Sequence, residues 1–213
     1  MRQILITMLL LLGISVQAQI PNEVKDILKK CGEKMHSELG MEMDLNLRLS
    51  AMMMSMNGTM KVYKKGDKSF SIMTMKAFGK EMYTELGFDD KTEWEYNKAS
   101  DKDDCDSLVI TANAKPKKGK FSVDLSVDKE YKNAKLKTTG KFYEITFTDP
   151  LKKDTPKKTV LRIVKDTYML HQMETKVSIA TAKMTVSKIK VGVSDNIFVF
   201  DSKKYPNAVV VRK

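Results

Sequence analysis

The sequence predicts a single, mainly β domain of the α+β class, in which one antiparallel curved sheet is accompanied by an N-terminal helix. Three observations lead to this expectation. Most of the chain after residue 40 alternates apolar and polar side chains with a period of two. Turn signals separate these stretches at short intervals. One segment, just after an N-terminal apolar run, instead shows the three- and four-residue spacing of an amphipathic helix.

The composition is that of one folded domain. No linker interrupts the 213 residues, and 42% hydrophobic with 31% charged residues argues against both a disordered chain and a membrane protein. The net charge of +11 comes almost wholly from lysines that are scattered along the expected strands and turns. A solvated surface explains them, and contact with an anionic membrane or an acidic partner is the alternative.

The first residues predict export. Arg2 precedes the apolar run 4–12, and Val16-Gln17-Ala18 places small residues where a signal peptidase reads the chain. We therefore expect a secretory signal over residues 1–18, a domain over residues 19–213 and a mature protein free in the periplasm. The run is short for a membrane span, so a retained anchor is the weaker interpretation. Export also argues against a nucleic-acid partner.

Cys31 and Cys105 are the two cysteines of the chain. In an oxidising compartment they could form a disulfide, which in the chain-entropy model would stabilise the fold by about 4 kcal/mol. Two separate buried thiols are the alternative. No metal site is expected on them, because no histidine lies at ligand spacing from either.

The helix is expected to begin at Pro21-Asn22-Glu23 and to end near Gly40. Proline suits the first turn, asparagine can cap and glutamate complements the helix dipole. Its apolar stripe would consist of Val24, Ile27, Leu28, Cys31 and Met35.

Strands are expected through most of the remaining chain. The alternation that starts at Met41 shifts its parity at Met52, which suggests a β-bulge near Ala51. Asn57-Gly58 and Lys65-Gly66-Asp67 are typical of turns. The pattern predicts roughly nine to eleven antiparallel strands with one dry and one wet face. Further strands are expected at 60–63, 70–75, 82–88, 93–96, 142–147, 161–163, 168–176, 180–187, 197–200 and 209–211.

Residues 97–140 are the least regular part. The segment 121–131 fits a helix, because apolar residues recur four apart, and fits a strand, because Phe121, Val123, Leu125 and Val127 alternate. A helix is slightly favoured. The acidic stretch 101–106 lacks the glycine and the distal glutamate of an EF-hand loop, so a solvated turn is expected there instead of a calcium site.

Methionine is the outstanding residue of the composition. Of its 16 copies, fourteen follow the signal and eleven of those lie between Met35 and Met82. Methionine is flexible, so it suits a surface that must fit varied apolar shapes and specifies a core poorly. A malleable ligand-binding face and plain core filling under the helix both remain open. Thioethers also bind Cu(I), so the segment 52–56 suggests a copper site as a rival, although Met53 would point away from Met52 and Met54 on a strand.

Sequence motifs of enzymes are lacking. The chain contains no Gly-x-Ser-x-Gly, no His-Glu-x-x-His and no Gly-rich phosphate loop, and neither His36 nor His171 has a motif around it. We expect no catalysis, no cofactor and no resident metal.

Three stretches resemble the periplasmic outer-membrane lipoprotein carrier (LolA) family. Residues 58–70 resemble a strand, turn and strand of that family. Residues 89–97 resemble its Asp-Gly-Lys-Thr-x-Trp-x-Tyr-Asn hairpin, with Asp90 in place of the glycine. Residues 195–200, followed by Pro206, resemble its closing Phe-x-Phe strand and proline-containing turn. The resemblance in element order covers nearly the whole mature chain.

The resemblance implies an unclosed half-barrel whose concave apolar face is lidded by the N-terminal helix and a mid-chain lid segment. It implies a monomeric carrier that takes lipoprotein acyl chains, or another lipid, from an inner-membrane exporter to an outer-membrane receptor. Lys65 stands where the family has the arginine that helps close the lid, and lysine cannot make the same forked hydrogen bonds. Trp94 and Tyr96 would line the cavity or simply pack the sheet. The expected cavity lining is Leu45, Leu47, Leu49, Met52, Met54, Met56, Met82, Leu86, Trp94, Tyr96, Tyr143, Ile145 and Phe147.

Overall fold

The computed structural model describes residues 20–52, 54–100, 104–114 and 126–213. The expected secretory signal lies outside these residues. So does most of the segment 121–131, and with it the expected mid-chain lid.

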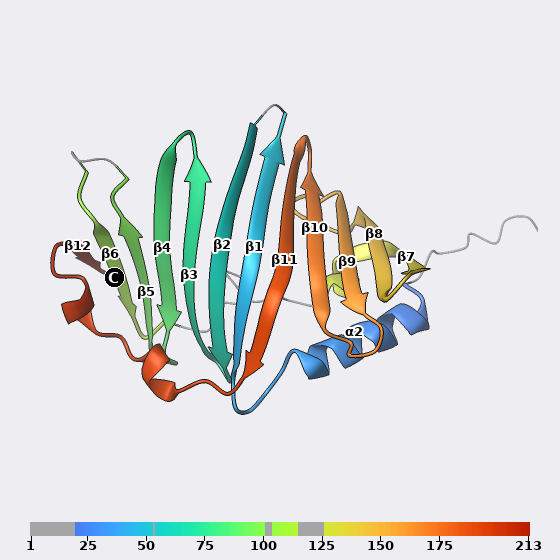
Figure 1. Ribbon diagram of the computed structural model, residues 1–213, viewed down its shortest axis with the longest axis horizontal. Coiled ribbons are helices and arrows are strands. Elements are labelled where there is room, and N and C mark those ends of the chain that lie inside the picture. The colour runs from blue at the N-terminus through green and yellow to red at the C-terminus, as the bar shows by residue number, and fades with distance from the viewer. Residues whose placement is uncertain (1–19, 53, 101–103, 115–125) are drawn as a thin grey trace, which may run out of the picture.

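The described strands form one unclosed sheet (Figure 1). Its order is β12-β6-β5-β4-β3-β2-β1-β11-β10-β9-β8-β7, so β12 and β7 are its edges and β1 joins two meanders. All pairs are antiparallel except β12 with β6. The predicted unclosed half-barrel is confirmed, and the structure describes one strand more than the upper expectation. The strands are β1 (Met41–Ala51), β2 (Met54–Lys65), β3 (Lys68–Ala77), β4 (Lys80–Phe88), β5 (Thr92–Lys98), β6 (Ser107–Ala112), β7 (Tyr131–Thr139), β8 (Phe142–Pro150), β9 (Lys158–Val164), β10 (Leu170–Val177), β11 (Ala180–Val191) and β12 (Val209–Arg212).

The expected helix is present as α2 (Asn22–Lys34), which is shorter than predicted. Pro21 occupies the N-cap position in place of Asn22, and no side chain caps this end. Beyond Met35 the chain turns before Gly40, where a positive φ of 79° directs it into β1. The apolar stripe of α2 is buried against the sheet.

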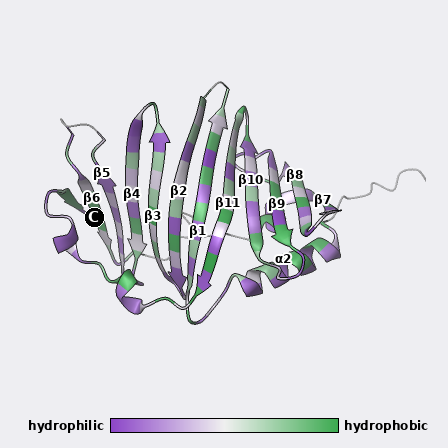
Figure 2. Ribbon diagram, viewed as in Figure 1, coloured by the Kyte–Doolittle hydropathy of each residue, from purple (hydrophilic) through white to green (hydrophobic). Residues whose placement is uncertain are grey.

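The sheet face that α2 covers is called the inner face here. Beneath α2, four apolar side chains of β8 and β9 that point to this face are completely buried, and apolar side chains of β1, β2 and β11 complete the core. Burying each large apolar side chain stabilises the fold by about 1.5–3 kcal/mol, so this core is the main source of stability. Figure 2 shows the alternating hydrophobic and hydrophilic bands along the strands that produce it. The core includes Leu45, Val186, Ile145, Phe147, Leu161 and Ile163.

A second, smaller core lies on the opposite side of the sheet, called the outer face here. Trp94 in β5 lies opposite Gly87 in β4 and opposite Ile110 in β6. These three positions face away from the inner face. The C-terminal segment, with the 3-10 helices η2 (Asp195–Phe198) and η3 (Ser202–Lys204), covers this row. Phe200 places its ring centroid 5.3 Å from that of Trp94, and Tyr205 is part of the same cluster.

Two local predictions around Ala51 are wrong. The chain makes a hairpin turn between Ala51 and Met54, so the parity shift reflects a turn and not a bulge. Asn57-Gly58, expected as the turn, lies inside β2. A register irregularity does occur between β1 and β11, where Ser187 falls outside the paired residues and its Oγ donates a 2.9 Å hydrogen bond to the Asp44 carbonyl.

Two further segments differ from the expected pattern. Residues 197–200 are not a strand. They belong to η2 and the chain after it, where Phe198 is buried and Phe200 is half-buried. In the irregular middle, the described residues form β6, the 3-10 helix η1 (Ser126–Lys129) and β7. Tyr131 therefore starts a strand at the edge of the sheet.

Candidate functional site

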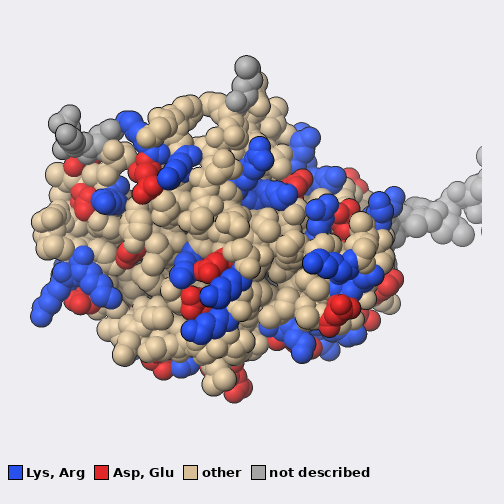
Figure 3. All heavy atoms as spheres, viewed as in Figure 1, with Lys and Arg blue, Asp and Glu red and all other residues tan. Residues whose placement is uncertain are grey.

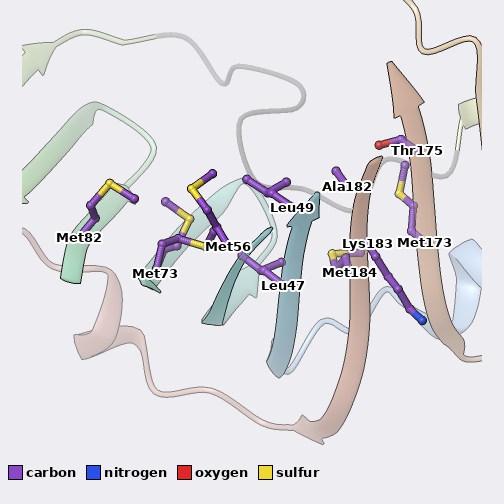
Figure 4. A pocket seen from close by; sticks show the side chains of 11 residues that line it. Leu47, Leu49, Met56, Met73, Met82, Met173, Thr175, Ala182, Lys183 and Met184 are labelled. Atoms are coloured by element: carbon purple, nitrogen blue, oxygen red, sulfur yellow. The ribbon is translucent and has the colours of Figure 1, made fainter. Parts of the chain in front are cut away.

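A pocket of about 410 Å³ opens on the inner face, beyond the part of the sheet that α2 covers. Figure 4 shows most of its side chains projecting from the ends of neighbouring strands toward a shared space, while the Lys183 side chain points away from it. Its lining is formed almost entirely by apolar side chains, and six of its eleven members are methionines. The lining residues are Leu47, Leu49, Met56, Met73, Met75, Met82, Met173, Thr175, Ala182, Lys183 and Met184.

The cross-strand register brings these side chains together. Residues that lie directly opposite in an antiparallel pair point to the same face of the sheet. Leu47 is opposite Met184, and Met184 is opposite Met173, so one row crosses β1, β11 and β10. A neighbouring row continues the lining from Leu49 to Met56 in β2.

Gly58 explains how the pocket extends toward β3 and β4. It is opposite Leu47 in β1 and Met75 in β3. A Cβ atom at this position would lie 2.4 Å from Met75 Sδ and 2.4 Å from the Thr74 carbonyl oxygen. Because glycine has no side chain, the methionine can lie across β2 and complete the lining.

The chemistry of the lining suits an apolar ligand. Leucine and methionine side chains carry no proton donor, and the thioethers adapt to irregular shapes. The volume falls in the range of about 300–1,000 Å³ that small-molecule sites occupy. In the described residues no group of three or more His, Cys, Asp or Glu side chains could hold a metal ion.

The expected lining residues fall in several different places. Leu47, Leu49, Met56 and Met82 lie in the pocket, as Figure 4 shows. Leu45, Ile145 and Phe147 are buried in the core beneath α2, Tyr143 packs at its border, and Leu86 lies on β4 outside the pocket. Met52 and Met54 are exposed at the tip of the β1–β2 hairpin, while Trp94 and Tyr96 lie on the outer face.

The pocket also contains residues that sequence reasoning did not select. Met73, Met75, Met173 and Met184 all lie in segments that were expected as strands. The alternation of apolar and polar residues in these strands was a signal that could have identified the four methionines. The pairing of β1 with β11, strands more than a hundred residues apart in sequence, was not readable from local pattern.

A set of tyrosines and carboxylates holds the C-terminal segment on the outer face. Tyr205 Oη donates to Glu85 Oε2 at 2.6 Å, and Tyr83 donates to the other oxygen of the same carboxylate. Tyr96 Oη donates to Asp106 Oδ2 at 2.6 Å. Burial, together with the hydrogen bond to Asp106, raises the pKa of Tyr96 to about 12.

Lys65 also contacts the C-terminal segment. Its Nζ donates to Asp195 Oδ2 at 2.8 Å, and this contact lowers the pKa of the Asp195 carboxyl. The residue lies at the end of β2 that is opposite to the pocket. Since the expected lid lies outside the described residues, a role of Lys65 in lid closure stays a prediction.

Both cysteines are free, so the possible disulfide is not formed. Cys31 is buried in α2 and Cys105 is exposed before β6, and these elements lie at opposite ends of the sheet (Figure 1). The alternative of two buried thiols therefore holds for Cys31 alone. Burial raises the pKa of the Cys31 thiol to about 12.

None of the helices in the described part of the chain combines the length and the apolar character that a membrane span requires.

Comparison with known proteins shows similarity in structure but not in sequence. Neither a protein-family model nor a curated protein matches the chain. An uncharacterized conserved protein from Thermus thermophilus aligns with a TM-score of 0.53 at 12% identity, over 90% of this chain and 99% of its own. The lipoprotein LppX of Mycobacterium tuberculosis aligns with a TM-score of 0.51 at 11% identity, over 81% and 98%.

A LolA superfamily protein from Nitrosomonas europaea is also similar, with a TM-score of 0.39 at 13% identity, over 84% of this chain and 98% of its own. At these identities the similarity concerns the fold. The unclosed half-barrel that the sequence resemblance implied is confirmed, and its fold is similar to that of LppX.

Proposed function

We propose that this protein is a periplasmic carrier, which encloses acyl chains of lipoproteins or related lipids in the methionine-lined pocket and shuttles them toward the outer membrane. The observation that carries the proposal is an apolar pocket of about 410 Å³ that α2 leaves unfilled, on the same face as the main core. A core built only for stability would close such a space, because an unfilled cavity is destabilising.

Transfer of an acyl chain from water into this pocket is favourable. Each buried methylene contributes about 0.8 kcal/mol, so a dozen methylenes contribute about 10 kcal/mol before the loss of chain and protein entropy is subtracted. Thr175 and Lys183 are the polar members of the lining, and no histidine, cysteine or carboxylate lies beside them in it, so we take the mechanism to be enclosure and release without a covalent step. An inner-membrane exporter would supply the cargo and an outer-membrane receptor would accept it.

The first test is native mass spectrometry of the protein purified from its own periplasm. We expect a bound lipid whose mass identifies the acyl chains. Bound copper in its place would favour the rival metal-binding function, because six thioethers line the same pocket.

A pair of variants connects the bound lipid to the pocket. Ala182→Phe places a ring among the lining side chains and should reduce the recovered lipid. Thr181→Phe adds the same ring to the neighbouring residue, which points to the other face of β11, and should leave the lipid unchanged. Equal lipid content in both variants would contradict the assignment of the pocket.

A lipoprotein-release assay on spheroplasts tests the shuttling role separately. Addition of the protein should release lipoproteins into the medium, and Ala182→Phe should release fewer than Thr181→Phe. If release is no higher than with an inert protein, the hypothesis of a lipoprotein cargo is rejected. Bound lipid in the mass spectra would then still support a carrier of another lipid.

A further inference from the structure

Four consecutive hairpins of the sheet turn at the end where the pocket opens. In sheet order they connect β3 with β4, β1 with β2, β10 with β11, and β8 with β9. Neighbouring strands lie about 4.8 Å apart, so these turns form a continuous border of roughly 30 Å. Leu49, Met56 and Met82, which line the pocket, lie within a few residues of the turns.

The turns carry large apolar side chains that project into solvent. Phe78 is 82% exposed, Met52 is 83% exposed and Ile179 is 61% exposed. Surface turns ordinarily use Asn, Asp, Gly or Ser, because these residues suit both water and the turn geometry. We call this set the apolar rim: Met52, Met54, Phe78, Leu151, Val177 and Ile179.

The backbone geometry makes the choice of residues more unusual. Phe78 and Gly79 both have positive φ, 54° and 77°, which corresponds to a type I′ turn between β3 and β4. Asn-Gly is the preferred pair for this turn, and a bulky residue in the left-handed region is destabilising. Met52 has a φ of 50° at the tip of the next hairpin. Within the described structure neither the Phe78 nor the Met52 side chain is buried, so burial does not offset the destabilising backbone conformation.

The apolar rim is flanked by basic residues. The segments 76–81, 150–158 and 176–180 contain seven lysines and two acidic residues. One of those acids, Glu81, is paired with Lys76 at 3.6 Å. On the face of the molecule that Figure 3 shows, several Lys and Arg side chains lie toward the upper edge, where the hairpins turn. A surface with exposed apolar tips among lysines complements an anionic lipid bilayer, which attracts positive charge and accepts apolar side chains at its interface.

We propose that the apolar rim docks this protein onto an anionic lipid bilayer. The tips would enter the interfacial region while the flanking lysines contact acidic headgroups. The mouth of the pocket would then face the membrane, and an acyl chain could move between bilayer and pocket without crossing water. The inference goes beyond the carrier role, because docking requires no cargo.

Vesicle flotation tests the docking surface with the purified protein. Vesicles of phosphatidylcholine are compared with vesicles of phosphatidylcholine and phosphatidylglycerol at low and at high salt. We expect association with the anionic vesicles only, weakened by salt because exposed charges are screened. Phe78→Asn should weaken it about tenfold, the loss expected when roughly half of a phenylalanine's apolar burial is removed.

The same variant provides its own check on folding. Asparagine is favoured in this turn, so Phe78→Asn should raise the thermal midpoint while it weakens vesicle binding. Leu39→Asn is the matched control: Leu39 is 67% exposed, but lies beyond α2 at the opposite end of the sheet. It should bind vesicles like the unaltered protein.

Three results would overturn the inference. The first is the absence of vesicle binding, or equal binding to neutral and anionic vesicles. The second is an equal loss of binding in Phe78→Asn and Leu39→Asn. The third is a dimer in sedimentation velocity that Phe78→Asn dissociates, because the apolar rim would then be covered by a second copy of the chain. Since none of these measurements involves cargo, they leave the carrier proposal to its own tests.

Discussion

Gly87 offers the most direct test of the packing on the outer face. It lies in β4 opposite Trp94, which is only 2% exposed. A Cβ atom at Gly87 would lie 1.9 Å from Trp94 Cζ2 and 2.0 Å from Cε2. These are atoms of a rigid ring held between Phe70 and Phe200, so a small rotation cannot relieve the overlap. Gly87→Ala should therefore displace the indole and disturb the whole second core.

The expected magnitude follows from two opposing effects. Overpacking in a filled core typically destabilises by about 1–3 kcal/mol. Replacing glycine by alanine in a strand recovers about 0.5–1 kcal/mol through the unfolded chain. Because the overlap involves a ring with no free space beside it, we expect a net loss of about 2 kcal/mol. For a protein of this size that corresponds to a thermal midpoint lower by about 4–8 °C.

The assay uses Trp94 itself, because it is the sole tryptophan of the chain. Urea unfolding followed by tryptophan fluorescence gives the free energy of unfolding, and the native spectrum should shift to longer wavelength as the indole becomes more exposed. Gly32→Ala is the control, since a Cβ at this position of α2 would meet no atom within 4 Å. It should stabilise the protein by about 0.5–1 kcal/mol. A Gly87→Ala protein with unaltered stability and an unaltered spectrum would refute the packing described for this face.

Two further predictions concern titratable side chains. Because burial raises the pKa of Cys31 to about 12, a thiol reagent at mildly alkaline pH should label Cys105 alone in the native protein and both cysteines in denaturant; rapid labelling of a Cys105→Ser variant would contradict the burial of Cys31. The pKa of Tyr96 is raised to about 12, so its neutral form stabilises the fold fully below about pH 10 and that contribution is lost as the pH rises toward the folded value. Thermal midpoints should therefore fall from about pH 10 upward, less steeply in Tyr96→Phe, and identical slopes for the two proteins would exclude this residue as a cause.

The alternation of side chains predicted the strands but not the identity of their faces. Met41 to Leu49 form a strand whose apolar side is the inner face, because α2 is available to cover it. Trp94 and Tyr96 alternate just as clearly, yet their side is covered by the C-terminal segment on the outer face. Which side of a strand becomes dry depends on a distant covering element, and the local pattern does not contain that information.

Glycine and methionine misled the assignment of turns for a related reason. Asn57-Gly58 has the composition of a hairpin turn, but Gly58 is needed where the Met75 side chain crosses β2. The actual turn lies after Ala51, in a run of methionines that has no turn preference of its own. At Gly58 the packing of Met75 overrides the local turn preference, and after Ala51 the chain turns where the local sequence has none, so the sequence pattern placed neither position correctly.

The separation of the two cores has a consequence for how this protein unfolds. They lie on opposite sides of one sheet, and no buried residue belongs to both. We therefore expect that either end of the sheet can open while the other keeps its packing. Hydrogen exchange should therefore divide the sheet into two cooperative units: a slowly exchanging one around β8 and β9, and a less protected one around β5 and β6, secured by a C-terminal strap that can detach by itself.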